Sequence, residues 1–193
     1  MIYSDCIVTD RLILRRFVEE DLEDVFALMS DSYIAEKAGF KPFKSLESVQ
    51  SFMRNWSDGA YAITERSSDM VIGIIQLPCF FWESRVEIGY WLDEDYRGKG
   101  YMTEAIEAVK AYVFENFRWC REMRIYVYEG NDASSNVALK CGFFPVYEAY
   151  KQNVYSQFGN VESELAYSMT RGDYEWEKRG LPYFSTETVK AAA

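Results

Sequence analysis

Short alternations of apolar and polar residues predict a series of strands along the chain. Residues 11–15, with the sequence RLILR, alternate in this way and predict the first strand. Two further strands are predicted at 61–64 and 70–76, with the polar turn 66–69 between them. The same pattern predicts later strands at 85–92, 124–128, 146–154 and 165–169.

Apolar residues spaced three and four apart predict helices between these strands. Helices are expected over residues 20–30, 45–56, 101–116 and 131–142, and Ser45 is expected to cap the second of them. The resulting order is β-α-α-β-β-β-α-β-α-β-β. It predicts an α/β (α+β) fold in which helices flank a mixed, mostly antiparallel central sheet.

One domain is expected to span residues 1–193, because no linker, repeat or low-complexity segment divides the sequence. A chain of 193 residues is long enough to bury a sizeable core. Residues 171–193 form a polar and aromatic C-terminal tail that follows the last predicted strand.

The charge balance limits the classes of molecule that the protein can bind. Acidic residues outnumber basic residues by 31 to 21, which gives a net charge of −10. Such a surface repels nucleic-acid phosphates and would favour a cationic substrate such as an amine. The alternative is that the acidic excess only keeps the protein soluble. No apolar run approaches the roughly 18 residues that a membrane span needs, and no signal-peptide pattern is present. We therefore expect a cytoplasmic protein without nucleic-acid or membrane partners.

The residue types present also limit the chemistry. The four cysteines are too far apart in sequence for a Cys-x-x-Cys site, which favours reduced thiols and no metal. Histidine is absent, so the chain has neither a His-containing triad nor the commonest metal ligand. Any proton transfer must fall to Glu, Asp, Tyr, Lys, Cys or a water chain.

A glycine-rich turn at residues 96–103 stands between a predicted strand and the start of the longest predicted helix. Such a turn exposes backbone N–H groups that have no partner within the helix, and it binds phosphate-like anions. A Walker A loop is excluded because Tyr101, not a Lys-Ser or Lys-Thr pair, follows Gly100. A dinucleotide fingerprint is excluded because Thr103 replaces its third glycine. The alternative is a tight connection with Gly98 or Gly100 at positive φ.

Several segments resemble the GNAT acetyltransferases. The stretch Arg97-Gly98-Lys99-Gly100-Tyr101-Met102 resembles their acyl-CoA pyrophosphate loop, Gln/Arg-x-x-Gly-x-Gly/Ala. Residues 9–15 and 87–92 resemble the opening and central strands of the RimJ/RimL branch. Residues 131–134 and 140–143 are similar to its cofactor-side helix and the corner after it. The matches span residues 9–170. Met102 departs from the usual Gly or Ala, and a side chain there would narrow the approach to the pyrophosphate.

The resemblance implies a GNAT-type fold and acetyl-CoA as the cofactor. It assigns the pyrophosphate to the backbone of the loop and the pantetheine to the neighbouring strand and helix, with a bulge that splays this strand from the next. A backbone N–H there, such as that of Leu92, would stabilise the oxyanion. The alternative role for Asn131 is an ordinary helix cap. The expected cofactor-binding residues are Trp91, Leu92, Arg97, Gly98, Lys99, Gly100, Tyr101, Met102, Thr103 and Asn131.

The resemblance also implies catalytic residues. Many relatives place a Tyr acid seven residues after the Asn, where this chain has Ala138, so the acid is expected to be Ser134. The alternative is that Ser134 only satisfies the first helical turn. Glu87 is the leading candidate for the base, acting through one water, and its alternative is a solvent-facing glutamate. Tyr90 would lie on the opposite face of that strand.

Weaker candidates for the chemistry lie outside these motifs. Glu36 and Glu83 are further base candidates in predicted loops. Cys141 could form an acyl-enzyme, although a core position is the alternative. The aromatic run 80–82 could line an acceptor pocket, belong to the core or form a dimer face.

The leading functional hypothesis is an N-acetyltransferase of the RimJ/RimL type that acetylates a primary amine, most simply a protein N-terminal α-amine. A second hypothesis is acetylation of a small amine such as a polyamine, an amino acid or an antibiotic. For these two, an open groove would indicate a peptide and a closed acidic pocket a small amine. A third hypothesis is a noncatalytic acyl-CoA sensor. Relatives imply a monomer or a homodimer.

Overall fold

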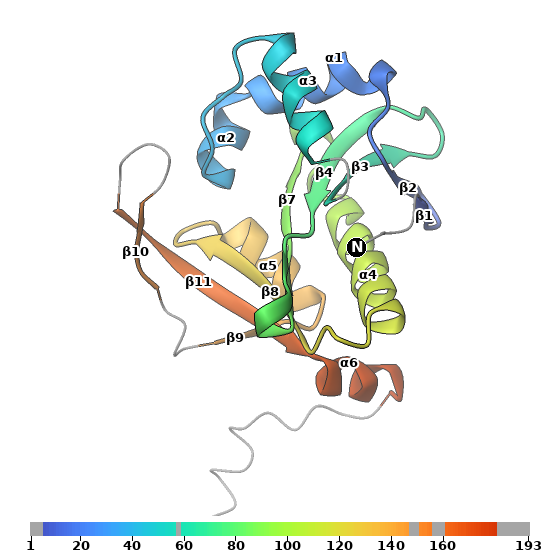
Figure 1. Ribbon diagram of the computed structural model, residues 1–193, viewed down its shortest axis with the longest axis vertical. Coiled ribbons are helices and arrows are strands. Elements are labelled where there is room, and N and C mark those ends of the chain that lie inside the picture. Colours follow the sequence, from blue (N-terminus) through green and yellow to red (C-terminus); the bar gives the residue numbers. More distant parts are fainter. Residues whose placement is uncertain (1–5, 57–58, 147–150, 156–160, 181–193) are drawn as a thin grey trace, which may run out of the picture.

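The computed structural model describes residues 6–56, 59–146, 151–155 and 161–180, with the side chains of 151–155 and 161–163 left aside. Two sheets make up the framework (Figure 1). The first is antiparallel and has the order β1-β2-β3-β4-β7. Its strands are β1 (Cys6–Val8), β2 (Leu12–Arg15), β3 (Ala60–Glu65), β4 (Val71–Gln76) and β7 (Gly89–Leu92).

The second sheet has the order β10-β11-β8-β6-β5, and its β6–β8 pair is the parallel one. A further short strand, β9, pairs with β11. The strands are β5 (Cys79–Phe80), β6 (Arg85–Glu87), β8 (Glu122–Tyr128), β9 (Phe144–Pro145), β10 (Lys151–Tyr155) and β11 (Val161–Thr170).

Helices α1 (Leu22–Ser30), α2 (Ser32–Ala38) and α3 (Leu46–Asn55) lie together at one end of the molecule and bury a core cluster against the first sheet. Helices α4 (Tyr101–Asn116) and α5 (Asp132–Lys140) pack on the other face, and α6 (Arg171–Lys178) closes the opposite end. Short 3₁₀ turns occupy η1 (Glu19–Asp21), η2 (Phe81–Glu83) and η3 (Glu94–Tyr96). None of the helices among the described residues is long and apolar enough to cross a membrane.

The strand predicted over residues 85–92 is interrupted, and this interruption creates the site. The Ile88 N–H still donates to the Arg124 carbonyl of β8 at 2.8 Å, whereas Gly89 already lies opposite Gln76 of β4. The chain therefore changes partners between β6 and β7, and a gap opens between β7 and β8. The prediction of one continuous strand was wrong in this respect.

The other elements differ from the sequence prediction at α2 and toward the C-terminal end of the chain. Helix α2 was not predicted. It is short, and its cap is the Asp31 side chain, which accepts a hydrogen bond from the Ile34 N–H at 2.7 Å. Helix α6 begins in the expected polar tail, with a capping box formed by Thr170 and Asp173. Strand β10 covers only the later part of the predicted strand 146–154, and residues 147–150 lie outside the described residues.

Candidate active site

A cavity of about 300 Å³ lies where the gap beside β7 meets the first turns of α4 and α5. Most of the expected cofactor-binding residues border it: Trp91, Leu92, Arg97, Gly98, Gly100, Tyr101, Met102, Thr103 and Asn131. Ser134 borders it too, whereas Lys99 and Glu87 do not. The sequence did not indicate that Tyr33 and Lys37 of α2 would contribute to its wall.

The loop before α4 has the backbone that an anion site needs. Gly98 and Gly100 have φ values of 73° and 81°, whereas a positive φ at one of them was expected under the alternative of a tight connection. A Cβ added at Gly98 would meet no heavy atom within 4 Å, so a ligand can approach the backbone there. The N–H groups of the first turn, at Tyr101, Met102 and Thr103, have no acceptor within the helix. Together with the helix dipole they favour a phosphate at this position.

Arg11 holds this loop from the first sheet. Its Nη1–H donates to the Lys99 carbonyl at 2.8 Å, and its Nε–H donates to Glu104 of α4 at 2.6 Å. Thr9 also donates to Glu104, at 2.6 Å. Burial alone would raise the pKa of Glu104, but the hydrogen bonds from Thr9 and Arg11 outweigh it, and the pKa is lowered. The contacts of Arg11 with Lys99 and Glu104 were not predicted from the sequence, although Arg11 is part of the first predicted strand.

The charged residues that border the cavity are basic: Lys37, Arg97 and Lys140. Within the described lining there is no acidic residue, although the whole chain carries a net charge of −10. The Arg97 guanidinium lies 4.8 Å above the Tyr33 ring, and its Nε–H donates to the Leu92 carbonyl at 3.1 Å. A phosphorylated cofactor fits this lining, because its negative charges meet basic side chains and backbone donors.

Met102 does not narrow the approach to the loop, contrary to the expectation from sequence. Its side chain is only 5% exposed and packs in the core cluster with residues of α4 and the sheets. The side chain is thus directed into the core, and the departure from Gly or Ala at this position leaves the face of the loop open.

The backbone of β7 presents Leu92, but not Trp91, to the gap. The Asp93 N–H donates to the Ile72 carbonyl at 2.9 Å, so Asp93 and Ile72 are a hydrogen-bonded pair of the ladder between β7 and β4. Hydrogen-bonded pairs alternate in an antiparallel ladder, so Trp91 also bonds toward β4, where it lies opposite Ile74. The peptide groups of Leu92 point away from β4. The expectation that Trp91 contributes peptide groups to a bound ligand therefore needs correction.

The start of α5 brings Asn131, Ser134 and Tyr90 together. The Asn131 Oδ1 accepts a hydrogen bond from the Ser134 N–H at 3.2 Å, so Asn131 is the helix cap and also borders the cavity. The Tyr90 hydroxyl donates to the Ser134 carbonyl at 3.2 Å. Burial raises the pKa of Tyr90, which keeps this donor protonated. Among the described residues the Ser134 hydroxyl has no partner, so it can act on a ligand.

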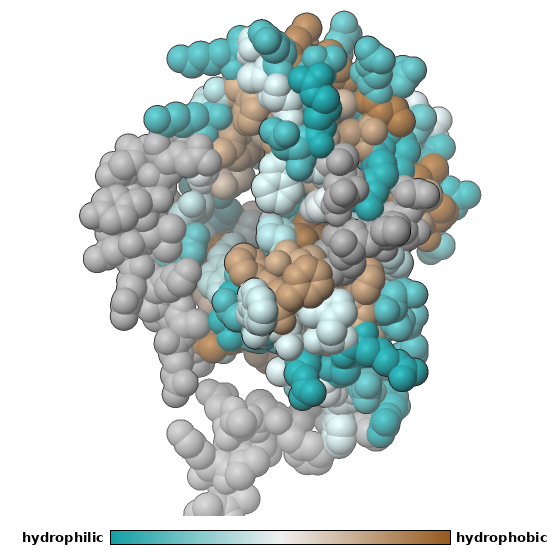
Figure 2. All heavy atoms as spheres, viewed as in Figure 1, coloured by the Kyte–Doolittle hydropathy of each residue, from teal (hydrophilic) through white to brown (hydrophobic). Residues whose placement is uncertain are grey.

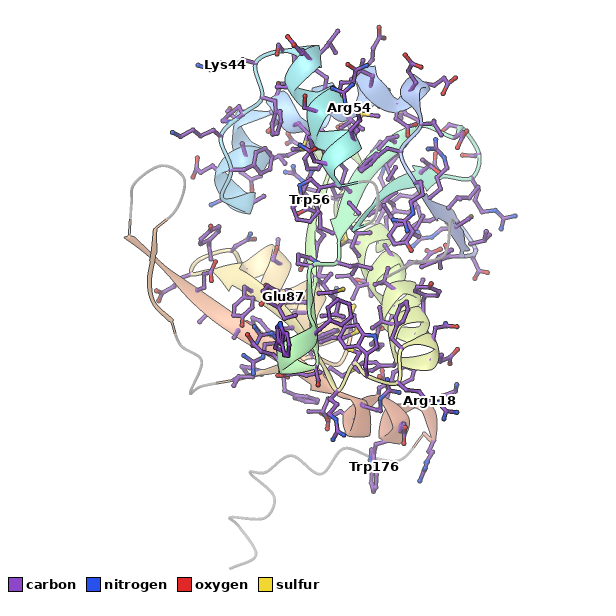
Figure 3. The ribbon with its side chains drawn as sticks, viewed as in Figure 1. Lys44, Arg54, Trp56, Glu87, Arg118 and Trp176 are labelled. Carbon is purple, nitrogen blue, oxygen red and sulfur yellow. The ribbon has the colours of Figure 1, made fainter. Side chains whose placement is uncertain are left out.

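Glu87 lies on the opposite face of the sheet from Ser134. Its neighbours Val86 and Ile88 point into the core cluster under α4 and α5. Side chains alternate along a strand, so Glu87 points to the opposite face. Trp91 lies on that opposite face as well, where it packs with the cluster under α1–α3. Glu87 accepts a hydrogen bond from Arg85 at 3.0 Å, and its side chain is 23% exposed. It lies on β6, where Figure 3 labels it, and it does not border the cofactor cavity.

The structure also shows where the weaker candidates for the chemistry lie. Cys141 is fully buried, and burial raises the pKa of its thiol to about 12, so the core alternative describes it. Glu83 forms an ion pair with Arg85, and Glu36 is exposed on α2. Phe81 and Trp82 are 54% and 102% exposed, and with Phe80 they border neither described cavity. Figure 2 shows hydrophobic surface, in brown, beside η2.

A second cavity of about 580 Å³ lies between α3, the α2–α3 loop and β7. It meets the first cavity at Ala38 and Trp91, which border both. Strand β7 therefore lies between two cavities. The first has basic side chains and unpaired backbone N–H groups in its lining, and the second, larger one lies on the side of α3. Two neighbouring cavities of this kind suit a transfer between two substrates.

Comparisons with known proteins agree with this geometry. The family model described as Acetyltransferase (GNAT) domain matches residues 11–144. The uncharacterized N-acetyltransferase YoaA of Bacillus subtilis is 29% identical over 143 residues, which cover 70% of this chain and 80% of YoaA. YdaF of the same organism is 31% identical over 94 residues, about half of each chain.

The fold recurs in solved structures. A GNAT-family acetyltransferase from Bacillus anthracis superposes with a TM-score of 0.79 and 23% identity, over 86% of this chain and 99% of the other. The expected GNAT-type fold, with helices that flank mixed, mostly antiparallel sheet, is thus confirmed. On the match of the family model to most of its length, the chain belongs to the GNAT family and is an acetyl-CoA-dependent N-acetyltransferase.

Proposed function

We propose that this enzyme acetylates the α-amine of a protein N-terminus, with Ser134 as the acid and Glu87 as the base. The observation that carries the chemistry is the meeting of the α4 loop, the Leu92 backbone and the Ser134 hydroxyl at one cavity. The choice of a protein acceptor is supported by the RimJ/RimL-like segments and by the similarity to YdaF, whose name proposes a ribosomal acceptor.

Bound acetyl-CoA supplies a thioester-activated acetyl group. In the proposed site, the N–H groups at the start of α4 and the side chains of Lys37, Arg97 and Lys140 hold the phosphates. The Leu92 N–H, which points into the gap, would stabilise negative charge on the acetyl oxygen. The Ser134 hydroxyl would give its proton to the departing sulfur and regain one from solvent water. Tyr90 and Asn131 keep Ser134 in place through its carbonyl and its N–H.

Glu87 is proposed to take the proton of the attacking amine through a water. It shares a face with Trp91, which borders the second cavity, and Gly89 lies between them without a side chain. An amine that enters from the second cavity can therefore lie above Gly89, on the side of the strand where Glu87 stands. An acceptor amine must be neutral to attack, so a base on this side is needed.

The base assignment is tested with Glu87→Gln. We expect kcat/KM to fall about 100-fold at neutral pH, with the loss of the acidic limb of the pH profile. Glu83→Gln is the matched control, because Glu83 pairs with the same arginine, Arg85. An unchanged pH profile in Glu87→Gln, or an equal loss in Glu83→Gln, would show that another group removes the proton.

The acceptor is tested with purified enzyme and acetyl-CoA. Calorimetry measures cofactor binding, and release of free CoA thiol is then followed with N-terminal peptides and with small amines. The proposal expects thiol release with peptides that carry a free α-amine and none with the same peptides blocked at that amine. Release only with small amines would reject a protein acceptor.

A further inference from the structure

The walls of the second cavity are aromatic. Phe52 and Trp56 come from the end of α3, Phe40 and Phe43 from the loop before it, and Trp91 from β7. Their rings form one connected set, because Phe40 lies 5.5 Å from Trp91 and Phe52 lies 5.9 Å from Phe43 and 6.4 Å from Trp91, measured between ring centroids. Such a wall favours an aromatic or large apolar group.

The charged side chains that border this cavity are Lys41 and Lys44, which are both exposed. The described lining contains no aspartate or glutamate. This local charge is opposite to the net charge of −10, from which a cationic substrate was expected. A polyamine would meet two ammonium groups and no carboxylate here, so the cavity disfavours it.

The aromatic walls also reach the site of transfer. Trp91 borders both cavities, and it lies on β7 between Tyr90 and Leu92, whose backbone faces the cofactor side. A group held against Trp91 is therefore next to the strand beside which the acetyl group is proposed to lie. The exposed pair Lys41 and Lys44 is the rim of this cavity, and Lys44 lies near the start of α3, where Figure 3 shows it at the edge of the molecule.

We propose that this cavity selects an amine that carries an aromatic or large apolar group and, beyond it, a carboxylate. The apolar group packs among Phe40, Phe52 and Trp91, and the carboxylate meets Lys41 and Lys44. This inference rests on the proposed acetyl transfer and names its substrate class. The same chemistry belongs to a peptide with an apolar first residue and an acidic second one, whereas a free aromatic amino acid carries its carboxylate beside the amine and does not fit.

The test compares acceptors that differ only in charge. The dipeptides Phe-Glu, Phe-Gln and Phe-Lys, all amidated at the C-terminus, are compared with free phenylalanine and with spermidine by release of CoA thiol. We expect kcat/KM to fall in the order Phe-Glu, Phe-Gln, Phe-Lys, by about tenfold overall. A higher value for free phenylalanine than for Phe-Glu would overturn the inference, because the carboxylate of phenylalanine lies beside the amine. Spermidine as the best acceptor would overturn the inference.

Two pairs of variants locate the effect. Lys44→Glu is expected to remove the preference for Phe-Glu over Phe-Lys, while Arg118→Glu, an exposed cation far from Lys44 in Figure 3, leaves it unchanged. Trp56→Ala is expected to raise KM for all three dipeptides about 30-fold, because Trp56 borders the cavity and its ring lies 6.4 Å from that of Phe52. Trp176→Ala, on α6, is the control. An unaltered preference in Lys44→Glu would refute the role of the rim.

Direct binding separates this inference from the proposed function. The products N-acetyl-Phe-Glu and N-acetyl-Phe-Lys are titrated into the wild type and Lys44→Glu by calorimetry, with CoA present. Tighter binding of the acidic product to the wild type alone supports the cavity assignment, whether or not turnover is found. Equal binding of both products rejects it. Failure to bind acetyl-CoA and to release thiol with any amine would instead reject the proposed function.

Discussion

At the scale of single residues, two hydrogen bonds hold Ser134 at the start of α5 and leave its hydroxyl free. The Ser134 N–H is bound by Asn131, and its carbonyl is bound by Tyr90, both at 3.2 Å. These bonds use the backbone of Ser134 and not its side chain. The hydroxyl can therefore be removed without loss of the helix cap. This separation makes a clean mutational test possible.

Ser134→Ala is expected to lower kcat about 100-fold and to leave the affinity for acetyl-CoA nearly unchanged. The reason is that a proton donor is needed when the sulfur departs, whereas cofactor binding uses the α4 loop and basic side chains. Steady-state kinetics and calorimetry check the two expectations. Ser135→Ala is the control, since Ser135 is the next residue of α5 and does not border the cavity. Wild-type turnover in Ser134→Ala would mean that water or another group is the acid.

At the scale of elements, the turn into α4 was predictable because its chemistry is local. Positive φ values at Gly98 and Gly100, the exposed N–H groups and the long apolar stripe of α4 all follow from neighbouring residues. Met102 shows where local reasoning stops. Whether its side chain covers the loop or enters the core depends on how α4 is rotated against the sheets, which no short motif specifies.

Gly100→Glu tests this turn as a phosphate site. A glutamate there places a negative charge beside the pyrophosphate and a side chain at φ 81°, and we expect acetyl-CoA binding to weaken at least 100-fold. Gly180→Glu is the matched control, because Gly180 has φ 64° and open space around it at the end of α6. Calorimetry gives both affinities. Unchanged affinity in Gly100→Glu would place the pyrophosphate elsewhere.

The interruption at Ile88 does not follow from the apolar alternation, although the family resemblance implied a bulge that splays this strand from the next. Apolar residues continue without a break at 86, 88, 90 and 92. Such alternation predicts the face of the sheet to which each side chain points, but not the strand with which each residue pairs. The second cavity was missed for a related reason. Its walls come from a loop at 39–45, the end of α3 and β7, which are brought together only by the fold. Alternation did correctly place Tyr90 and Glu87 on opposite faces.

At the scale of the whole molecule, α6 joins the end of α4 to the end of α5 below the second sheet (Figure 1). Arg171 contributes by donating to the carbonyls of Phe114 and Phe117 at 2.6 and 2.7 Å. Lys110 of α4 is 1% exposed, and its ammonium donates to Glu177 of α6 and to the Cys141 carbonyl, each at 3.0 Å. One buried cation thus connects three helices that are far apart in sequence.

Lys110→Met is expected to lower the free energy of unfolding by about 1–2 kcal/mol. Methionine keeps much of the apolar stem, and the glutamates at 107 and 177, which are 43% and 38% exposed, regain water. The Cys141 carbonyl cannot, so its unmade hydrogen bond accounts for most of the cost. Urea unfolding measures the change. Lys178→Met is the control, because its ion pair with Glu115 is exposed and is expected to contribute under about 1 kcal/mol. Equal stability of Lys110→Met and wild type would mean that desolvation of the ammonium already offsets its three hydrogen-bonded contacts.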